Sequence, residues 1–265
     1  MAKRRYLDLK GPWLVAHRGG SALAPENTFP AFDRAAALGA DVLEIDVRLT
    51  LDGAVVVFHD ESTERLTGQP GTIEARKLSE VAALDAAHAF SPDGGASFPM
   101  RGTGVTVPTF AAALARYPRL RFNVDAKTED SALAEALVRD VRAAGAVERV
   151  CLGSFFDAQA ERLGALLPDA CRYLPQGAAT CHVMAAKSGA AGTGCPIGYD
   201  LADLPHRMSG MTIVDARVVA YFHGRGIPVH VWTVDDEGEM RSLLALGVDG
   251  IVTDRPDVLA RVLGR

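Results

Sequence analysis

Two pairs of ionisable residues lie at the ends of the first two apolar runs of this 265-residue chain. His17 and Arg18 end the run that begins at Trp13, and Glu44 and Asp46 stand one residue apart late in the second run. Strand side chains alternate between the two faces of a sheet, so Glu44 and Asp46 project from the same face. We therefore expect an imidazole, a guanidinium and two carboxylates to converge on one site.

A third carboxylate, that of Asp125, ends a later apolar run and is expected to join the other two. Crowded carboxylates repel one another and resist ionisation, and a divalent cation removes that conflict. Oxygen ligands favour Mg²⁺ or Ca²⁺ over zinc, which more often recruits His or Cys. The alternative is structural ion pairing, in which Glu44 pairs with Arg18 or Arg48. Asp125 would then pair with Lys127.

Two histidines stand where proton transfer would be needed. His59 ends the strand-like run that begins at Ala54, so its imidazole is expected to face that of His17 across the carboxylates. Phosphodiester cleavage needs one group to accept a proton and another to donate one, and an imidazole with a pKa near 6.5 can do either. We expect structural roles for the histidines at other positions, namely His88, His182, His206 and His223.

Arg18 and Lys127 supply positive charge for a phosphate. A guanidinium offers a fork that matches two phosphate oxygens, whereas an ammonium is a point charge. Lys127 shares a strand face with Asp125, which directs it to the same site. Trp232 lies late in the seventh apolar run, where it either walls the substrate pocket or fills the barrel core.

Apolar runs alternate with helical segments along the chain, which is the pattern of parallel βα units. Strands are expected over residues 14–17, 42–47, 121–126, 150–152, 171–174, 197–204, 229–233 and 250–253. Helices are expected over residues 28–38, 109–117, 131–144, 158–167, 181–187, 216–225, 238–246 and 257–263. These units predict a single (β/α)8 TIM barrel over residues 1–265, with function at the C-terminal ends of its strands. A doubly wound sheet would place a glycine-rich phosphate fingerprint after the first strand, which HRGGSA does not match.

A segment from residue 60 to about residue 107 interrupts this alternation after the second strand region. It is rich in Gly, Pro, Ser and Thr and includes the string SPDGGASFPMRGTGVTVP. Its length exceeds that of an ordinary connection. Because it starts directly after His59, we expect it to form a cap over the site rather than a loosely ordered excursion.

Composition excludes several other classes of protein. Hydrophobic residues make up 48% of the chain and the net charge is -5, which argues against non-specific nucleic-acid binding. A membrane-spanning helix requires about 18 consecutive apolar residues, and no apolar run approaches this length. The basic residues Lys3, Arg4 and Arg5 are not followed by the apolar run of a signal peptide, so we expect a cytoplasmic protein. The cysteines show no CxxC spacing and are expected to be reduced, namely Cys151, Cys171, Cys181 and Cys195.

Eight short strings, VAHRGG, PENT, LEIDV, VVFHD, NVDAK, GSF, VHVWTVDD and GVDGIVTDRP, follow one another between about Trp13 and Leu259. In this order and at these distances they resemble the glycerophosphodiester phosphodiesterase family. The segment after His59, with RLTG, VAALDAAHAF and VPTF, is similar to the small insertion of that family. The resemblance implies hydrolysis of a small-molecule glycerophosphodiester to glycerol 3-phosphate and an alcohol, with a divalent cation.

The resemblance also implies a role for each basic candidate. His17 and His59 would be the acid/base pair, and Arg18 and Lys127 would bind the phosphate. Which histidine is the base is not decided by the sequence, and His17 as base with His59 as acid is our working assignment.

The carboxylates would hold the metal. Glu44 and Asp46 stand at ligand positions of the family, and Asp125 stands where the family often has glutamate. Aspartate is one methylene shorter, so the resemblance leaves the choice between Mg²⁺ and Ca²⁺ open.

Two other functions are compatible with the same fold. A lysophospholipase D would keep the two-histidine chemistry and need an apolar groove, for which Phe90, Phe98 and Met100 of the insertion are candidates. A barrel without catalysis could bind a phosphate ligand, but simple binding would not require two histidines for proton transfer. The sequence leaves the oligomeric state open.

Overall fold

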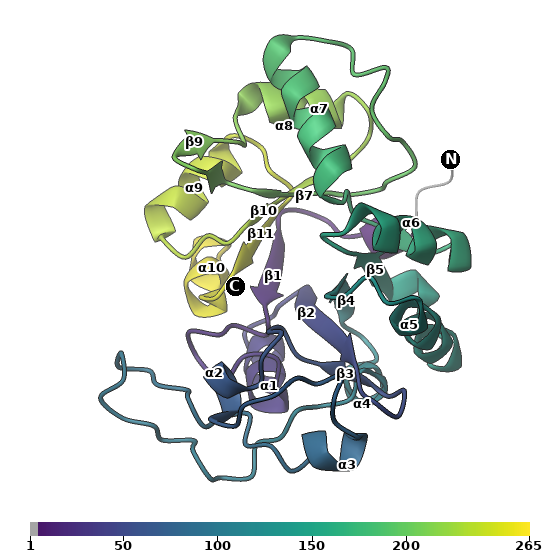
Figure 1. Cartoon of the computed structure of the whole chain (residues 1–265). Coiled ribbons are helices and arrows are strands. Elements are labelled where there is room, and N and C mark those ends of the chain that lie inside the picture. Colours follow the sequence, from purple (N-terminus) through teal and green to yellow (C-terminus); the bar gives the residue numbers. More distant parts are fainter. Residues whose placement is uncertain (1–4) are drawn as a thin grey trace.

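Eight of the apolar runs form a ring of parallel strands in the computed structural model, which describes residues 5–265 (Figure 1). The strands are β1 (Trp13–His17), β2 (Val42–Leu49), β4 (Arg121–Ala126), β5 (Val150–Gly153), β6 (Cys171–Arg172), β7 (Ala202–Pro205), β10 (Val229–Trp232) and β11 (Gly250–Thr253). They neighbour one another in the order β6-β5-β4-β2-β1-β11-β10-β7, and a parallel bridge between Tyr173 and Leu201 joins the two outer strands. The predicted TIM barrel is confirmed.

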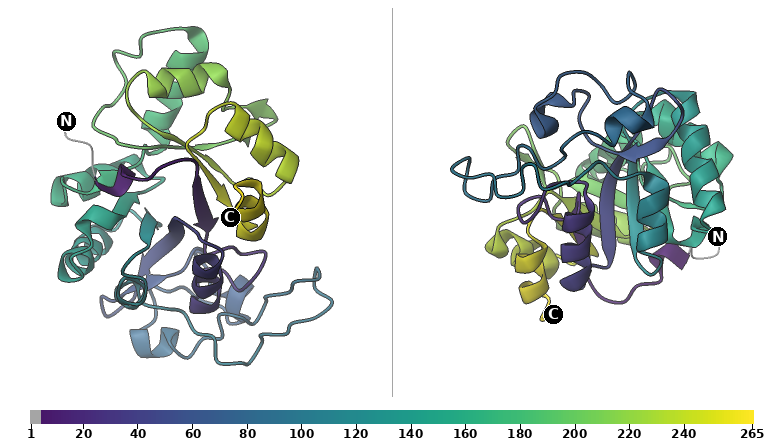
Figure 2. Two further views of the ribbon diagram at one scale, coloured as in Figure 1. Left: turned by 180° about the vertical axis from the view of Figure 1, so that it is seen from behind. Right: turned by 90° about the horizontal axis from the view of Figure 1, so that it is seen from below.

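Helices surround the ring, as the two views of Figure 2 show. They are α1 (Phe29–Ala37), α4 (Phe110–Arg116), α5 (Ser131–Ala143), α6 (Asp157–Leu166), α7 (Gln176–Ser188), α8 (Ala216–His223), α9 (Glu237–Ala245) and α10 (Pro256–Val262). Short 3-10 helices are η1 (Arg5–Leu7) and η2 (Val147–Arg149). Lys3 and Arg4, considered above for a signal peptide, lie outside the described residues. No helix within residues 5–265 combines the length and the apolar character that crossing a bilayer requires.

The alternation of side chains along β2 places its carboxylates inside the ring. Leu43 and Ile45 are fully buried in the main core, whose other members include α1 and α5 side chains. Val42 points the other way and joins a separate buried cluster with Trp13 and Val15. Glu44 and Asp46 share the face of Val42, because strand side chains repeat with period two. The main core therefore lies between strands and helices, and the polar site lies within the ring.

Three segments differ from the sequence-based expectation. The strand expected over residues 197–204 is β7, which covers Ala202–Pro205. The helix expected over residues 181–187 is α7, which starts at Gln176 directly after Pro175, a residue suited to a helix start. After β7, an unexpected hairpin is formed by β8 (Arg207–Met208) and β9 (Met211–Thr212). Ser209 and Gly210 between them both have positive φ, 49° and 79°, as a tight two-residue hairpin turn requires.

The insertion after the second strand has a small core of its own. It follows β3 (Val55–Val57), which pairs antiparallel with β2, and it contains α2 (Glu64–Thr67) and α3 (Leu78–Val81). Five of its buried apolar residues form a cluster with Val56 of β3 and with Phe58, and they are Leu66, Ile73, Val81, Ala86 and Val107. The segment is thus anchored to the barrel rather than draped over it as an unstructured excursion.

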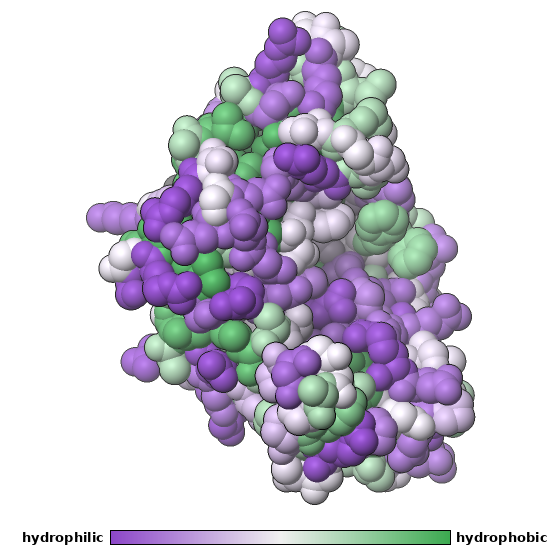
Figure 3. All heavy atoms as spheres, turned by 90° about the vertical axis from the view of Figure 1, so that its left-hand side faces the viewer, coloured by the Kyte–Doolittle hydropathy of each residue, from purple (hydrophilic) through white to green (hydrophobic). Residues whose placement is uncertain are grey.

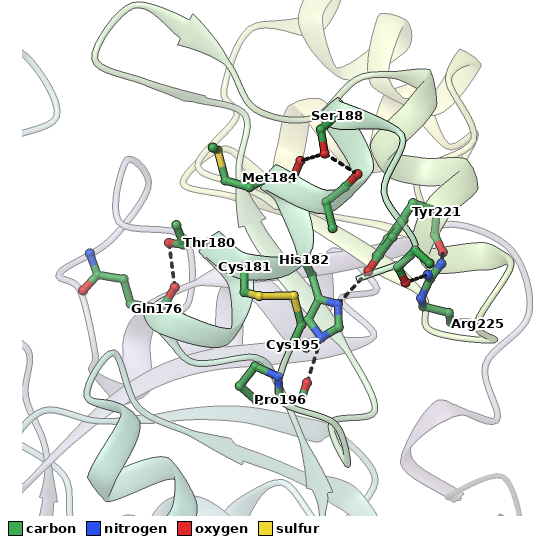
Figure 4. The surroundings of a disulfide bond; sticks show 12 residues. Gln176, Thr180, Cys181, His182, Met184, Ser188, Cys195, Pro196, Tyr221 and Arg225 are labelled. Carbon is green, nitrogen blue, oxygen red and sulfur yellow. Dashed lines mark hydrogen bonds between the residues drawn. A yellow bond between two sulfur atoms is a disulfide. The ribbon is translucent and has the colours of Figure 1, made fainter. Parts of the chain in front are cut away.

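The expectation that all four cysteines are reduced is wrong for two of them. Cys181 and Cys195 form a disulfide, whereas Cys151 and Cys171 are free and buried. His182, next to the disulfide, contacts the Tyr221 hydroxyl at 2.9 Å and the Pro196 carbonyl oxygen at 2.7 Å (Figure 4). The disulfide and the imidazole together hold the loop after α7 against the helices, which is the structural role expected of His182.

Candidate active site

The C-terminal ends of β1, β2 and β4 open into one cavity of about 510 Å³. All the catalytic, phosphate-binding, metal-binding and pocket-wall candidates from the sequence line it, namely His17, Arg18, Glu44, Asp46, His59, Asp125, Lys127 and Trp232. Strand register explains the grouping, because His17 is the neighbour of Glu44 and Asp46 is the neighbour of Asp125. Figure 3 shows a hollow in this side of the molecule, with hydrophilic atoms below it and hydrophobic atoms to its right.

Lys127 lies between two of the carboxylates. Its Nζ is 2.7 Å from Asp46 Oδ1 and 2.6 Å from Asp125 Oδ2, so the ion pair considered for Asp125 is present. Burial opposes the charge of Lys127, yet Asp125 and Asp46 raise its pKa above the usual value. Burial would likewise raise the pKa of Asp46, but Lys127 and Arg18 hold it well below its usual range. Both groups of this pair are therefore charged.

Glu44 is the least compensated carboxylate of the site. It accepts the backbone N–H of Arg18 at 3.0 Å, and His17 Nε2 lies 4.0 Å away. Burial and the neighbouring charge of Asp46 raise its pKa to about 8. A carboxyl in this position requires an additional positive charge to stay ionised at neutral pH.

A hard divalent cation fits the chemistry of these donors. Glu44, Asp46 and Asp125 offer only oxygen, and a cation beside Glu44 would supply the positive charge that it lacks. Within residues 5–265, no three His, Cys, Asp or Glu side chains stand together as a ready ligand group. The ammonium of Lys127 separates Asp46 from Asp125, so a cation held by all three carboxylates would have to share them with Lys127.

His17 is oriented by a carboxylate from the far end of the chain. Its Nδ1 lies 2.7 Å from Asp254 Oδ1, directly after β11, which leaves Nε2 toward Glu44 and the cavity. Because a carboxylate only accepts, Nδ1 carries the proton. Burial would lower the pKa of His17, but the hydrogen bond with Asp254 and the charge of Glu44 raise it above its usual value.

His59 is likewise held by a carboxylate, in this case that of the next residue in the chain. Its Nδ1 lies 2.7 Å from Asp60 Oδ1. Burial lowers the pKa of His59, and Lys127 adds to this effect while Asp46 opposes it. The charges of this chain alone therefore favour a protonated His17 and a neutral His59. A protonated His17 would be the acid and a neutral His59 the base, which is the reverse of the working assignment.

Arg65 of the insertion braces both sides of the site. It donates to Asp60 Oδ2 at 2.5 Å and to both carboxylate oxygens of Glu26 at 2.9 Å. Glu26 in turn accepts from Arg18 Nη1 at 2.8 Å. One guanidinium thus links the partner of His59 to the partner of Arg18. No residue of the described segment 60–107 lines the cavity.

Several residues of the site were missed in the sequence, although the motif strings contained some of them. Glu26 and Asn27 belong to PENT, Asp60 to VVFHD and Asp254 to GVDGIVTDRP. Asn27 donates to Asp46 Oδ2 at 2.8 Å from a backbone with φ of 58°. The strings therefore marked these positions, and only contacts between distant segments revealed their partners.

Two further polar residues reach the cavity from the other half of the ring. The Tyr173 hydroxyl donates to Asp125 Oδ1 at 2.9 Å, and Asp203 accepts from Asn123 Nδ2 at 2.6 Å. Burial raises the pKa of Asp203 to about 6. Trp232 both lines the cavity and packs on the buried cluster within the ring. The two positions expected for it, in the pocket wall and in the barrel core, are therefore not exclusive.

The ring, its carboxylate-oriented histidines and the cationic groups at one barrel mouth define a (β/α)8 barrel with a candidate active site at the C-terminal ends of its strands. Residues 17–258 match the Glycerophosphoryl diester phosphodiesterase family, and the chain belongs to that family. The resemblance inferred from the motifs is thereby confirmed, and the protein is an enzyme of this family.

Individual relatives cover nearly the whole chain. The chain is 31% identical to a probable glycerophosphodiester phosphodiesterase 2 of Mycobacterium tuberculosis, over 97% of this chain and 93% of the relative. It is 30% identical to a glycerophosphodiester phosphodiesterase of Caldanaerobacter subterraneus, over 94% and 97%. The crystal structure of a glycerophosphoryl diester phosphodiesterase domain from Mycobacterium tuberculosis has the same fold, with a TM-score of 0.86, 20% identity and coverage of 95% and 99%.

Proposed function

We propose that this enzyme hydrolyses glycerophosphodiesters to glycerol 3-phosphate and an alcohol, with a divalent cation, Mg²⁺ or Ca²⁺. The observation that carries the proposal is the pair His17 and His59 at one cavity, each with Nδ1 engaged by a carboxylate. A fixed tautomer leaves each Nε2 available for proton transfer. A phosphate between them would meet Arg18 and Lys127.

In the proposed reaction, one histidine accepts a proton from the nucleophile, which is the glycerol 2-hydroxyl or a water. The nucleophile forms a new bond to phosphorus as the bond to the alcohol oxygen breaks. The other histidine donates a proton to that oxygen. Attack by water gives glycerol 3-phosphate directly, whereas attack by the 2-hydroxyl gives a cyclic phosphate that a water then opens, with the two histidines exchanging their roles. Arg18 and Lys127 offset the negative charge on the remaining phosphate oxygens, an effect that usually contributes most to such reactions.

Glu44, Asp46 and Asp125 would hold the divalent cation. When bound, such an ion polarises the phosphoryl group and neutralises part of its charge. Trp232 would form part of the substrate pocket, and residues 60–107 would cap the site within the single domain through Arg65, which holds Asp60 and Glu26, without lining the cavity.

A location in the cytoplasm remains a prediction. The disulfide between Cys181 and Cys195 points in the other direction, because such bonds persist mainly in oxidising compartments.

The test is release of glycerol 3-phosphate from a panel of glycerophosphodiesters, with chelator and with added Mg²⁺ or Ca²⁺. We expect turnover with a restored cation, and a loss of at least about 10²-fold in His17→Ala and in His59→Ala. His223→Ala, at the exposed end of α8, is the matched control and should keep full activity. Absence of turnover of every diester in metal-replete enzyme would contradict the proposal.

A further inference from the structure

One side of the active-site cavity is rich in apolar side chains. Most of its charged residues come from the ends of β1, β2 and β4, whereas the segments that follow β5, β6 and β7 contribute hydrophobic side chains together with uncharged polar ones such as Gln176 and Thr180. We call these residues the apolar wall: Phe155, Val183, Met184, Met208, Met211 and Ile213. Phe155 follows β5, Val183 and Met184 lie on α7, and the other three belong to the β8–β9 hairpin or follow it.

Much of the apolar wall is exposed. The exposed fractions are 49% for Phe155, 65% for Met184, 45% for Met208 and 64% for Met211. Of the nine exposed large hydrophobic residues within residues 5–265, these four border this one cavity. Exposed apolar residues scattered singly are ordinary, whereas a group at the mouth of a binding cavity marks a ligand surface.

The chemistry of the wall suits an aliphatic chain. Methionine is unbranched and polarisable, so it adapts to a flexible apolar ligand. Among lining residues that follow Lys127 in the chain, Asp203 alone is an acid, and Asn123 already engages it at 2.6 Å. A cationic alcohol would therefore find little compensating charge there. A volume of about 510 Å³ lies in the range of drug-sized ligands, well above the need of a glycerol phosphate.

The apolar groove that we expected from the insertion does not line this cavity. Phe90, Phe98 and Met100 are absent from the cavity lining within residues 5–265. The ring of Phe98 instead lies 3.9 Å from the Arg101 guanidinium carbon. The apolar surface that reaches the catalytic residues is therefore supplied by α7 and the hairpin after β7.

We propose that the apolar wall binds an aliphatic chain carried by the phosphodiester substrate, on the leaving alcohol or on the glycerol. The preferred substrates are then amphiphilic phosphodiesters rather than fully hydrophilic ones. This inference rests on the proposed function, since it concerns the same cavity.

The experiment uses the metal-replete full chain and two substrate series below their critical micelle concentrations. One series lengthens an alkyl group on the leaving alcohol, and the other lengthens an acyl group on glycerophosphocholine. Full burial of a methylene corresponds to about a fourfold gain, so partial burial should raise kcat/KM about twofold for each added methylene in at least one series. The series that responds identifies which part of the substrate lies on the wall.

Variants test whether the wall causes the effect. Met208→Gln combined with Met211→Gln should lower the ratio of long-chain to short-chain kcat/KM by at least about fivefold, and Met184→Gln on another element should lower it in the same direction. Leu246→Gln, 40% exposed and outside the cavity lining, is the control and should leave the ratio unchanged.

Two results would overturn the inference. One is a kcat/KM that does not change with chain length in either series, and the other is a chain-length effect that is seen only above the critical micelle concentration. The short-chain diesters report the proposed function separately, because their turnover does not need the wall. If no diester is turned over, calorimetry can compare the affinities of the protein for alkyl phosphates of two and eight carbons, which still tests whether the apolar wall binds an aliphatic chain. Equal affinity for both would refute chain binding.

Discussion

The Nδ1 atom of His17 lies 2.7 Å from Oδ1 of Asp254, although 237 residues separate the two in the chain. β1 and β11 are neighbours in the ring, so the residues that follow them meet at the same mouth. The contact fixes the tautomer of His17 and raises its pKa, so we expect Asp254 to act as a positioning residue.

Replacing Asp254 should impair catalysis without unfolding the protein. Asp254→Asn is expected to lower kcat at least about 10²-fold, because the wrong tautomer is favoured. The limb of the pH–rate profile that belongs to His17 should move to lower pH, since its partner carboxylate is lost. Asp257→Asn, three residues on and paired with Arg255 at 2.9 Å, is the matched control. An unchanged kcat and profile would remove Asp254 from the site.

The two histidines should respond differently to an activated leaving group. A substrate whose leaving group needs no protonation should restore much of the activity of the variant that lacks the acid, and little of the variant that lacks the base. Single-turnover kinetics of His17→Ala and His59→Ala would measure this. Rescue of His59→Ala supports the working assignment, and rescue of His17→Ala supports the order that their pKa directions favour. Equal rescue contradicts any division of roles.

Asp125 should influence the choice of metal. Asp125→Glu lengthens the carboxylate by one methylene, and we expect it to stay within about tenfold of the original activity while changing the ratio of rates with Mg²⁺ and Ca²⁺. Asp125→Ala should lose most activity. Asp169→Asn, exposed in the turn after α6, serves as the control. The same metal ratio in all three variants would argue against Asp125 as a ligand.

The disulfide should stabilise the fold. Cys181 and Cys195 are 14 residues apart, and closing a loop of this size contributes about 3 kcal/mol to the free energy of unfolding. Denaturant titration of Cys181→Ser is expected to show this loss under oxidising conditions. Under reducing conditions the variant and the original protein should agree. A reductant that releases the thiols without any loss of stability would contradict the prediction.

His230 should make the stability depend on pH. Burial lowers its pKa from 6.5 to about 4, although Asp249 opposes this, so the unfolded chain binds a proton that the folded protein excludes. The stability contributed by neutral His230 is present above about pH 6.5 and is lost as the pH falls toward 4, at about 1.4 kcal/mol per pH unit.

Urea unfolding across this range measures the effect. His230→Leu should lose less stability than the original protein, by up to about 3 kcal/mol at about pH 4. His88→Leu, a half-buried histidine of the insertion, is the matched control. Parallel pH curves for His230→Leu and the original protein would show that His230 does not carry the dependence.

Periodicity and spacing were enough to predict the barrel and to bring the eight candidate residues to one cavity. The alternation along β2 placed Glu44 and Asp46 on one face, and parallel βα units placed the end of β4 beside them. These features could be predicted because the side-chain periods of strands and helices are set by residues a few positions apart in the sequence. The lining of one cavity by His17, Arg18, His59 and Lys127 follows from the same rule that strand ends meet at one mouth.

Contacts between distant segments were decided only by the tertiary structure. The pairing of His17 with Asp254 requires the ring to close, and the link from Arg65 to Glu26 requires the insertion to fold back on the first loop. The disulfide and the apolar wall likewise depend on how α7 and the β8–β9 hairpin pack. A sequence records residue types locally, whereas the partners of a side chain depend on the packing of the whole chain, which no local period encodes.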